Sequence, residues 1–197
     1  MAELLTGLFL AGVGIALGLY VADWDLHLPF LDHRSVFTHG VLLPMGVWWL
    51  LISGYTYADP FFEDARISAD SWAFGLRFFA LGFFSGYAIH MCFDVFPKRW
   101  VGGALIKSPF GVFPREGSIA WLLAGLLLSL YLAVRLIHSE AEAMVLLGLL
   151  VFLFRYYRKH EDTRWRPFFL MLILSFVIFI LEPPTWFRWE IKLPVSF

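Results

Sequence analysis

The stretch "LLTGLFLAGVGIALGLYVADWD", residues 4–25, decides the fold class of this chain. Residues 4–22 carry no charged side chain, and two aspartates, Asp23 and Asp25, follow directly. A helix rises about 1.5 Å per residue, so about twenty apolar residues cross the roughly 30 Å hydrocarbon core of a bilayer. The preceding residues contain Glu3 and no Lys or Arg, unlike a cleaved signal peptide. We therefore expect a retained membrane-spanning helix that ends in two carboxylates.

The composition of the whole chain indicates the same environment. Of 197 residues, 60% are hydrophobic and only 16% are charged, whereas about a quarter of the residues are charged in a typical soluble domain. Further apolar runs of helical length occur at residues 40–54, 74–96, 119–137, 143–157 and 168–181. The sequence predicts an all-α fold, a polytopic integral membrane bundle of about six transmembrane helices, or five if one short run does not cross. No repeat or change in composition divides residues 1–197, so we expect a single transmembrane domain.

The distribution of charge indicates topology. The formal net charge is −1, which offers no basic surface for contact with nucleic acid. With six spans, ten of the 15 Lys and Arg residues fall in connections on one side and four on the other, and Arg77 lies near the start of the third span. Since cytoplasmic connections accumulate Lys and Arg, we expect both termini on the non-cytoplasmic side. The single cysteine, Cys92, excludes an internal disulfide and a cysteine metal cluster.

Side chains of metal-ligand type are predicted to gather at the cytoplasmic ends of the first three spans. Two carboxylates end the first span, two histidines flank the start of the second, and a histidine and a carboxylate lie near the end of the third: Asp23, Asp25, His33, His39, His90 and Asp94. In "HMCFD", residues 90–94, the four-residue spacing places His90 and Asp94 on one helix face. His33 and His39 are six residues apart, so we expect His33 in the loop and His39 in the first helical turn.

Each of these residues also has an ordinary structural explanation. A carboxylate at a helix end is usually solvated, and His90 could simply pair with Asp94 inside the bundle. However, a carboxylate at a helix C-terminus opposes the helix dipole, and an unpaired ionisable residue in hydrocarbon is costly. The six residues together therefore favour a site. Asp32 is left outside it, as the N-cap of the second span, with Ser35 as the competing N-cap.

Mixed imidazole and carboxylate ligands suit zinc, manganese or iron, and they differ from the all-oxygen cage that calcium prefers. Six candidate ligands exceed the needs of one tetrahedral zinc, so we expect one or two divalent transition-metal ions, zinc or manganese first. Two ions with open coordination positions can polarise a phosphoryl oxygen and activate water. The planar guanidinium of Arg34 is then expected to clamp an anionic oxygen, unless its charge serves only topology.

The three motifs in this order resemble the YdjM-type family of inner-membrane metal-dependent hydrolases, in which Asp-x-Asp, His-Arg-x-x-x-Thr-His and His-x-x-x-Asp recur near the ends of the first three spans. The resemblance covers about the first half of the chain. It implies that the six His and Asp residues bind metal and that Arg34 and Thr38 act beside them as catalytic or supporting residues. The chain differs from the family at Gly40, where Ser is common, and at Phe96 and Pro97, where Thr and Gly are common.

The sequence therefore predicts a metal-dependent hydrolase embedded in the prokaryotic inner (cytoplasmic) membrane. We expect it to act at the cytoplasmic face on an ester or phosphoester bond of a lipid or lipid-linked substrate, with membrane lipids as its partners. The alternative is a non-enzymatic membrane subunit or assembly factor that uses the His and Asp residues structurally, or to hold an ion or a pigment such as haem between His39 and His90. A proton pathway would need acidic residues at mid-depth in the later spans, which the sequence lacks.

Two features outside the motifs carry expectations of their own. The Gly- and Pro-containing connection "VGGALIKSPFGVFP", residues 101–114, is expected to be re-entrant or to lie over the site, or to be an ordinary loop. Arg77 is expected to extend toward the headgroups or to pair with an acidic residue of the nearby connection, residues 55–72.

Overall fold

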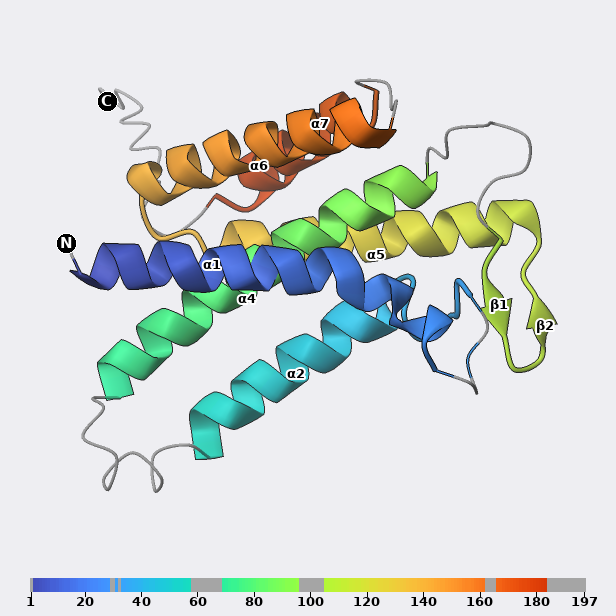
Figure 1. Cartoon of the computed structure of the whole chain (residues 1–197), viewed down its shortest axis with the longest axis horizontal. Helices are drawn as coiled ribbons and strands as arrows, with labels where there is room; N and C mark the ends of the chain where they lie inside the picture. Colours follow the sequence, from blue (N-terminus) through green and yellow to red (C-terminus); the bar gives the residue numbers. More distant parts are fainter. Residues whose placement is uncertain are drawn as a thin grey trace, which may run out of the picture.

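Helices make up most of the described part of the chain (Figure 1). The computed structural model describes residues 2–28, 31, 33–57, 69–95, 105–161 and 166–183. The elements in chain order are α1 (Ala2–Val21), the 3-10 helix η1 (Ala22–Leu26), α2 (Leu42–Tyr57), α4 (Ala69–Val95), β1 (Lys107–Ser108), β2 (Gly111–Val112), α5 (Arg115–Arg135), α6 (Glu140–Glu161) and α7 (Arg166–Leu181). Each of the predicted apolar runs is helical over most of its length, which confirms the all-α fold class.

Three of the described helices are long and apolar enough to cross a membrane, namely Leu5–Leu26, Trp72–Val95 and Arg115–Arg135. Two shorter apolar helices, Leu42–Ser53 and Phe169–Leu181, accompany them. Length and composition thus fit the expected membrane location. The six crossings and their orientation stay predictions.

Glycines bring the backbones of α1 and α4 into close contact. A Cβ added at any of four glycines would collide with a backbone carbonyl oxygen of the other helix: Gly14 and Gly18 on α1, Gly82 and Gly86 on α4. Each pair has the Gly-x-x-x-Gly spacing that lets membrane helices pack through their backbones. This contact holds the end of α1, and η1 after it, beside the last turns of α4.

Arg77 of α4 pairs with α6. Its guanidinium donates hydrogen bonds of 2.7 and 2.9 Å to the two carboxylate oxygens of Glu142. It also lies over the rings of Phe74 and Phe78, 5.6 and 4.7 Å from their centroids. The partner is therefore on α6, whereas the acidic connection suggested by the sequence lies largely outside the described residues.

The chain between α4 and α5 contributes a hairpin that lies against the loop before α2. β1 and β2 pair antiparallel, with Lys107 opposite Val112. The other edge of β1 meets the loop, because Val36 N donates to Lys107 O at 2.8 Å and Lys107 N donates to Arg34 O at 3.0 Å. Figure 1 shows the hairpin at the end of the molecule where η1 lies and α2 begins. The described part of the 101–114 connection is thus close to the predicted site.

Candidate metal centre

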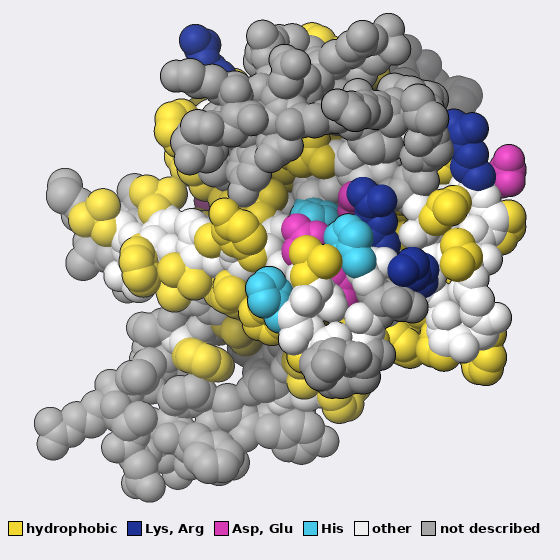
Figure 2. Space-filling model, turned by 45° about the vertical axis from the view of Figure 1, so that its right-hand side comes forward, with side chains coloured by type: hydrophobic (Ala, Val, Ile, Leu, Met, Phe, Trp, Pro, Cys, Tyr) yellow, Lys and Arg dark blue, Asp and Glu magenta, His cyan; other side chains and the backbone are white. Residues whose placement is uncertain are grey.

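Three separate segments bring the predicted ligands together at one end of the molecule. η1 supplies two aspartates, the loop before α2 two histidines, and the last turns of α4 a histidine and an aspartate: Asp23, Asp25, His33, His39, His90 and Asp94. We call these six residues the ligand cluster. Figure 2 shows His and Asp side chains gathered on one face of the molecule, with Lys and Arg side chains beside them and hydrophobic side chains around them.

The loop before α2 differs from its predicted course. His39 is not in the first turn of α2, because that helix begins at Leu42 and Gly40 adopts a φ of 130° that interrupts a helix. Ser35 is not the N-cap of α2 either, since it is buried and its amide donates to Asp25 Oδ2 at 2.9 Å. The other proposed N-cap, Asp32, lies outside the described residues. Both histidines reach the cluster from the loop itself.

The contacts inside the ligand cluster are longer than strong hydrogen bonds. Asp94 Oδ2 lies 3.2 Å from His90 Nε2 and 3.3 Å from His39 Nε2. Asp25 Oδ1 lies 3.5 Å from His33 Nδ1. A charge-assisted N–H···O bond is about 2.7–2.9 Å long, whereas two ligands of one tetrahedral zinc, bonded at about 2.0–2.2 Å, lie roughly 3.3–3.6 Å apart. The spacing therefore fits ligands around a metal ion better than direct pairing.

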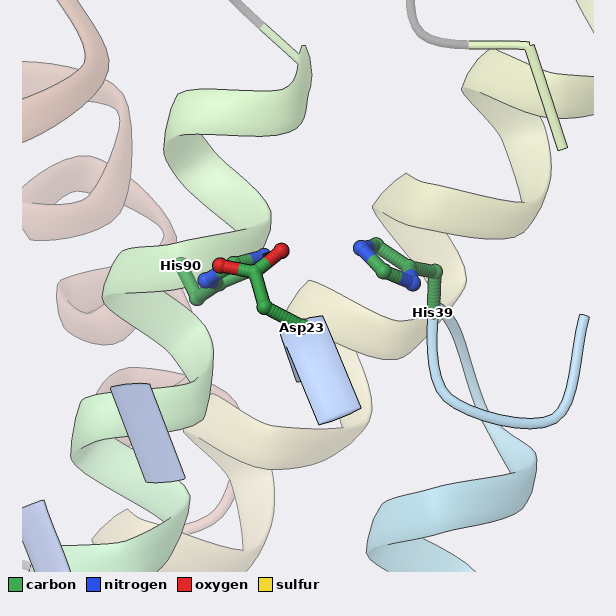
Figure 3. A group of neighbouring side chains, drawn as sticks. All are labelled: Asp23, His39 and His90. Atoms are coloured by element: carbon green, nitrogen blue, oxygen red, sulfur yellow. Dashed lines mark ion pairs between the residues drawn. The ribbon is translucent and has the colours of Figure 1, made fainter. Parts of the chain in front are cut away.

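Several of these atoms are buried without a hydrogen-bond partner among the described residues: Asp25 Oδ1, His39 Nε2, His90 Nε2 and Asp94 Oδ2. The side chains of His39 and Asp25 are 0% exposed. A buried polar atom without a hydrogen-bond partner costs about 1–3 kcal/mol, so the three of these atoms that lie together, His39 Nε2, His90 Nε2 and Asp94 Oδ2, indicate a cation there. In Figure 3 the Asp23 carboxylate points toward His90 on α4, and the His39 ring approaches from the loop before α2.

A hydrogen bond on the far side of the ring orients His90. His90 Nδ1 lies 2.9 Å from the backbone oxygen of Leu19. A carbonyl can only accept, so Nδ1 carries the proton and Nε2 presents its lone pair to the cluster. Metal-binding histidines usually have such a support. The hydrogen bond joins α4 to α1, and it therefore depends on the glycine contact between the two helices.

Thr38 orients two members of the cluster at once. Its hydroxyl donates to Asp25 Oδ2 at 2.9 Å and lies 3.0 Å from His39 Nδ1. Because the hydroxyl proton goes to the carboxylate, the hydroxyl oxygen accepts from His39 Nδ1–H. His39 Nε2 is then left with its lone pair facing Asp94. Thr38 therefore supports the ligands.

Arg34 faces the cluster from its edge. Its Nε lies 3.6 Å from Asp94 Oδ1, and the side chain is 33% exposed. The Nε atom is buried and has no hydrogen-bond partner in the described part of the chain. The φ of Arg34 is 62°, an uncommon value for a residue other than glycine, and one that persists where the surroundings hold it. Here the hydrogen bonds from Lys107 N to Arg34 O and from Val36 N to Lys107 O hold the backbone on the C-terminal side of Arg34.

Two residues that the sequence analysis did not single out fix the loop. Tyr87 is fully buried, and its hydroxyl accepts from Gly40 N at 2.8 Å and donates to Thr38 O at 2.8 Å. Trp121 of α5 packs on Gly40 so closely that a Cβ there would collide with the indole. Gly40, at the position where the YdjM-type family commonly has Ser, therefore fits this packing. Tyr87 lies three residues before His90, on the same helix face, a spacing that could have pointed to it.

The donor set fits a divalent metal ion. Ligand atoms in each of two groups, Asp23 with His39 and His90, and Asp23 with Asp25 and His33, lie within 4.8 Å of one another. Imidazole and carboxylate donors suit zinc, manganese or iron. A comparison with known proteins finds no family model, no curated protein and no solved structure that matches the chain. A proposal for the function therefore depends on the geometry and the donor atoms of the candidate site.

Proposed function

We propose that this protein is a membrane-embedded metal-dependent hydrolase that acts on an ester or phosphoester bond of a lipid or lipid-linked substrate. The observation that carries the proposal is the convergence of three buried atoms, His39 Nε2, His90 Nε2 and Asp94 Oδ2, at separations of 3.2 and 3.3 Å and without a hydrogen-bond partner among the described residues. The resemblance of the three motifs to the YdjM-type hydrolases supports the same assignment. Zinc and manganese are the ions that best suit these donors.

The chain supplies the parts that a hydrolytic site needs. A divalent ion in the ligand cluster would polarise an ester or phosphoryl oxygen and activate a water molecule. Arg34 would hold the anionic oxygen of the substrate in its planar guanidinium fork. Thr38 keeps Asp25 and His39 in place through its hydroxyl. Asp23, whose side chain is 40% exposed, lies at the opening of the cluster, where substrate enters.

Apolar side chains beside the cluster support a lipid substrate. Trp24 and Leu26, on either side of Asp25 in the sequence, are 51% and 59% exposed, and Phe37, next to Thr38, is 48% exposed. If α1 and α4 cross the bilayer, their ends lie at the depth of the headgroups, where aromatic side chains are enriched. The ester and phosphoester bonds of a membrane lipid lie at that same depth.

The role of Arg34 distinguishes the hydrolase hypothesis from the alternative, a non-enzymatic subunit that holds an ion. A guanidinium has donors only and cannot bind a metal. Arg34 lies at the edge of the ligand cluster, in an ion pair of 3.6 Å with Asp94, so a catalytic role for it would be toward an anionic substrate. The test is hydrolysis of a panel of ester and phosphoester lipids by the full chain in nanodiscs, with metal content measured in parallel.

We expect Arg34→Lys to retain its metal while turnover falls about 10- to 1000-fold, which corresponds to a lost transition-state interaction of about 1.4–4 kcal/mol. Arg135→Lys, which changes an exposed ion pair with Glu182 at the other end of α5, is the matched control and should keep full turnover. Stoichiometric metal with no hydrolysis of any lipid in the panel would instead support the non-enzymatic alternative.

A further inference from the structure

We infer that the ligand cluster is built for two metal ions held with unequal strength, in an inner and an outer position that share Asp23. The inner position is formed by Asp23, His39 and His90, with Asp94 beside them. The outer position is formed by Asp23, Asp25 and His33. The inference rests on the proposed metal site, but it does not depend on which reaction, if any, the site catalyses.

The two positions lie on opposite sides of the His39 ring, which is a ligand of the inner position only, because its protonated Nδ1 is held by Thr38. His39 Nε2 lies 3.3 Å from Asp94 Oδ2, whereas its Nδ1 lies 3.3 Å from Asp25 Oδ2. Four carboxylate and imidazole atoms of the ligand cluster are buried without a hydrogen-bond partner in the described part of the chain, and three of them lie at the inner position and one, Asp25 Oδ1, at the outer position. One ion among the inner ligands would leave Asp25 Oδ1 with only its 3.5 Å contact to His33 Nδ1, so the geometry provides for a second ion beside His33.

Asp23 is the residue that both groups contain. Its Oδ1 lies 3.8 Å from His90 Nε2, and its side chain is 40% exposed, so the carboxylate stands at the boundary between the buried and the open part of the cluster. A carboxylate has two oxygens and can serve two ions at once, as in sites that hold two metals about 3.5–4 Å apart.

The inner position should bind its metal ion more tightly, because its histidines are more buried and are held by hydrogen bonds. His39 is 0% and His90 15% exposed, whereas His33 is 43% exposed. The inner histidines are braced through Nδ1, by Leu19 O and by Thr38, and such braces increase metal affinity. His33 turns its Nδ1 toward Asp25 and projects toward solvent, so an ion bound there exchanges faster.

The donors of the two positions also differ in kind. The inner position has two imidazole nitrogens, which suit zinc, while the outer position has two carboxylates and one imidazole, a harder set that suits manganese or magnesium. The outer ion is therefore the one that responds to the supply of free cation. Occupancy of the outer position would regulate the site while the inner ion stays bound.

The test uses manganese alone, counted per chain. The full-length protein in detergent is freed of metal, loaded with excess MnCl₂, desalted, and then dialysed against a weak chelator. We expect two manganese ions per chain after desalting and one after dialysis, and an electron paramagnetic resonance spectrum that changes from a coupled pair to a six-line signal. His33→Gln should hold one ion at both stages and show the six-line signal from the start.

His27→Gln is the matched control, because His27 is an exposed histidine at the end of η1 that belongs to neither ligand group. It should behave as the unchanged protein does. The inference is overturned if the unchanged protein never holds more than one ion, if both ions leave together, or if His33→Gln still holds two. Complete absence of bound metal would overturn the proposed function as well, whereas two ions of unequal strength without hydrolysis would overturn only the hydrolase.

Discussion

Gly82 of α4 lies against the backbone carbonyl of Ala11 of α1, with no space for a side chain between them. Gly82→Ala should therefore push the helices apart, lower the free energy of unfolding by roughly 1–3 kcal/mol, as overpacking does, and weaken metal binding although no ligand is changed. Metal binding suffers because Asp23 follows α1, whereas His90 is on α4. Thermal unfolding in detergent and metal titration measure the two effects.

Gly12→Ala, on α1 as well, is the control for this prediction. A Cβ at Gly12 meets nothing within 4 Å, and alanine favours a helix over glycine by up to about 1 kcal/mol. This variant should be as stable as the original chain or more so, with unchanged metal binding. Equal behaviour of the two alanine variants would contradict the close packing of α1 on α4.

Thr38→Val should weaken metal binding about 10- to 100-fold, the usual effect of losing a support of metal ligands. Valine keeps the shape of threonine but removes the hydroxyl that joins Asp25 to His39. Competition with a chromophoric chelator measures the affinity. Thr38→Ser, which keeps the hydroxyl, should restore most of it; if serine binds metal no better than valine, the hydroxyl is not what orients the ligands.

The pair between Arg77 and Glu142 should make stability depend on pH. Burial alone would raise the pKa of Glu142, but the hydrogen bonds from Arg77 and from the His138 amide, together with the charge of Arg77, lower it below its ordinary value of 4.5. A carboxylate with a lowered pKa stabilises the fold above that ordinary value, and this contribution is lost as the pH falls through the folded-state pKa.

At neutral pH, Glu142→Gln should therefore cost roughly 1.5–3 kcal/mol, the usual worth of hydrogen bonds to a charged group. The difference from the original chain should shrink as the pH is lowered below 4.5. Melting temperatures in detergent from neutral to acidic pH give the measurement. Glu140→Gln, at an exposed position on the same helix, should change stability by less than about 0.5 kcal/mol. A difference for Glu142→Gln that is constant down to acidic pH would rule out the ionised pair as its source.

The expected topology puts the β1–β2 hairpin in the cytoplasm and the start of α6 outside it. Phe110 between the two strands is 100% exposed, and Glu140 begins α6 at the other end of the molecule (Figure 1). Cysteine placed at position 110 should react with an impermeant maleimide only after the cells are permeabilised, and cysteine at position 140 should react without that step. The native Cys92 is buried and provides the unreactive background. Labelling of both positions from one side would exclude the six-span arrangement.

Much of the site was predictable from the sequence because its parts lie at the ends of apolar runs. An apolar run of a given length predicts a helix, and successive crossing helices alternate in direction, so Asp25, His39 and Asp94 come to one end without any knowledge of how the helices pack. The four-residue spacing of His90 and Asp94 placed both on one face of α4 for the same local reason.

The contacts that fix the geometry of the candidate site depend on residues far apart in the sequence. The loop with His39 stays out of α2 because Tyr87 and Trp121, on two other helices, hold Gly40. Arg77 of α4 pairs with Glu142 of α6, which is 65 residues away in the sequence. Local hydrophobic patterns predict where helices lie along the chain, but they contain no information about which backbone or side chain lies opposite. The sequence by itself therefore determined the helices and the end of the bundle where the ligands lie. Only the tertiary structure, by packing α1 and α5 onto α4, decided which atoms of those ligands face one another.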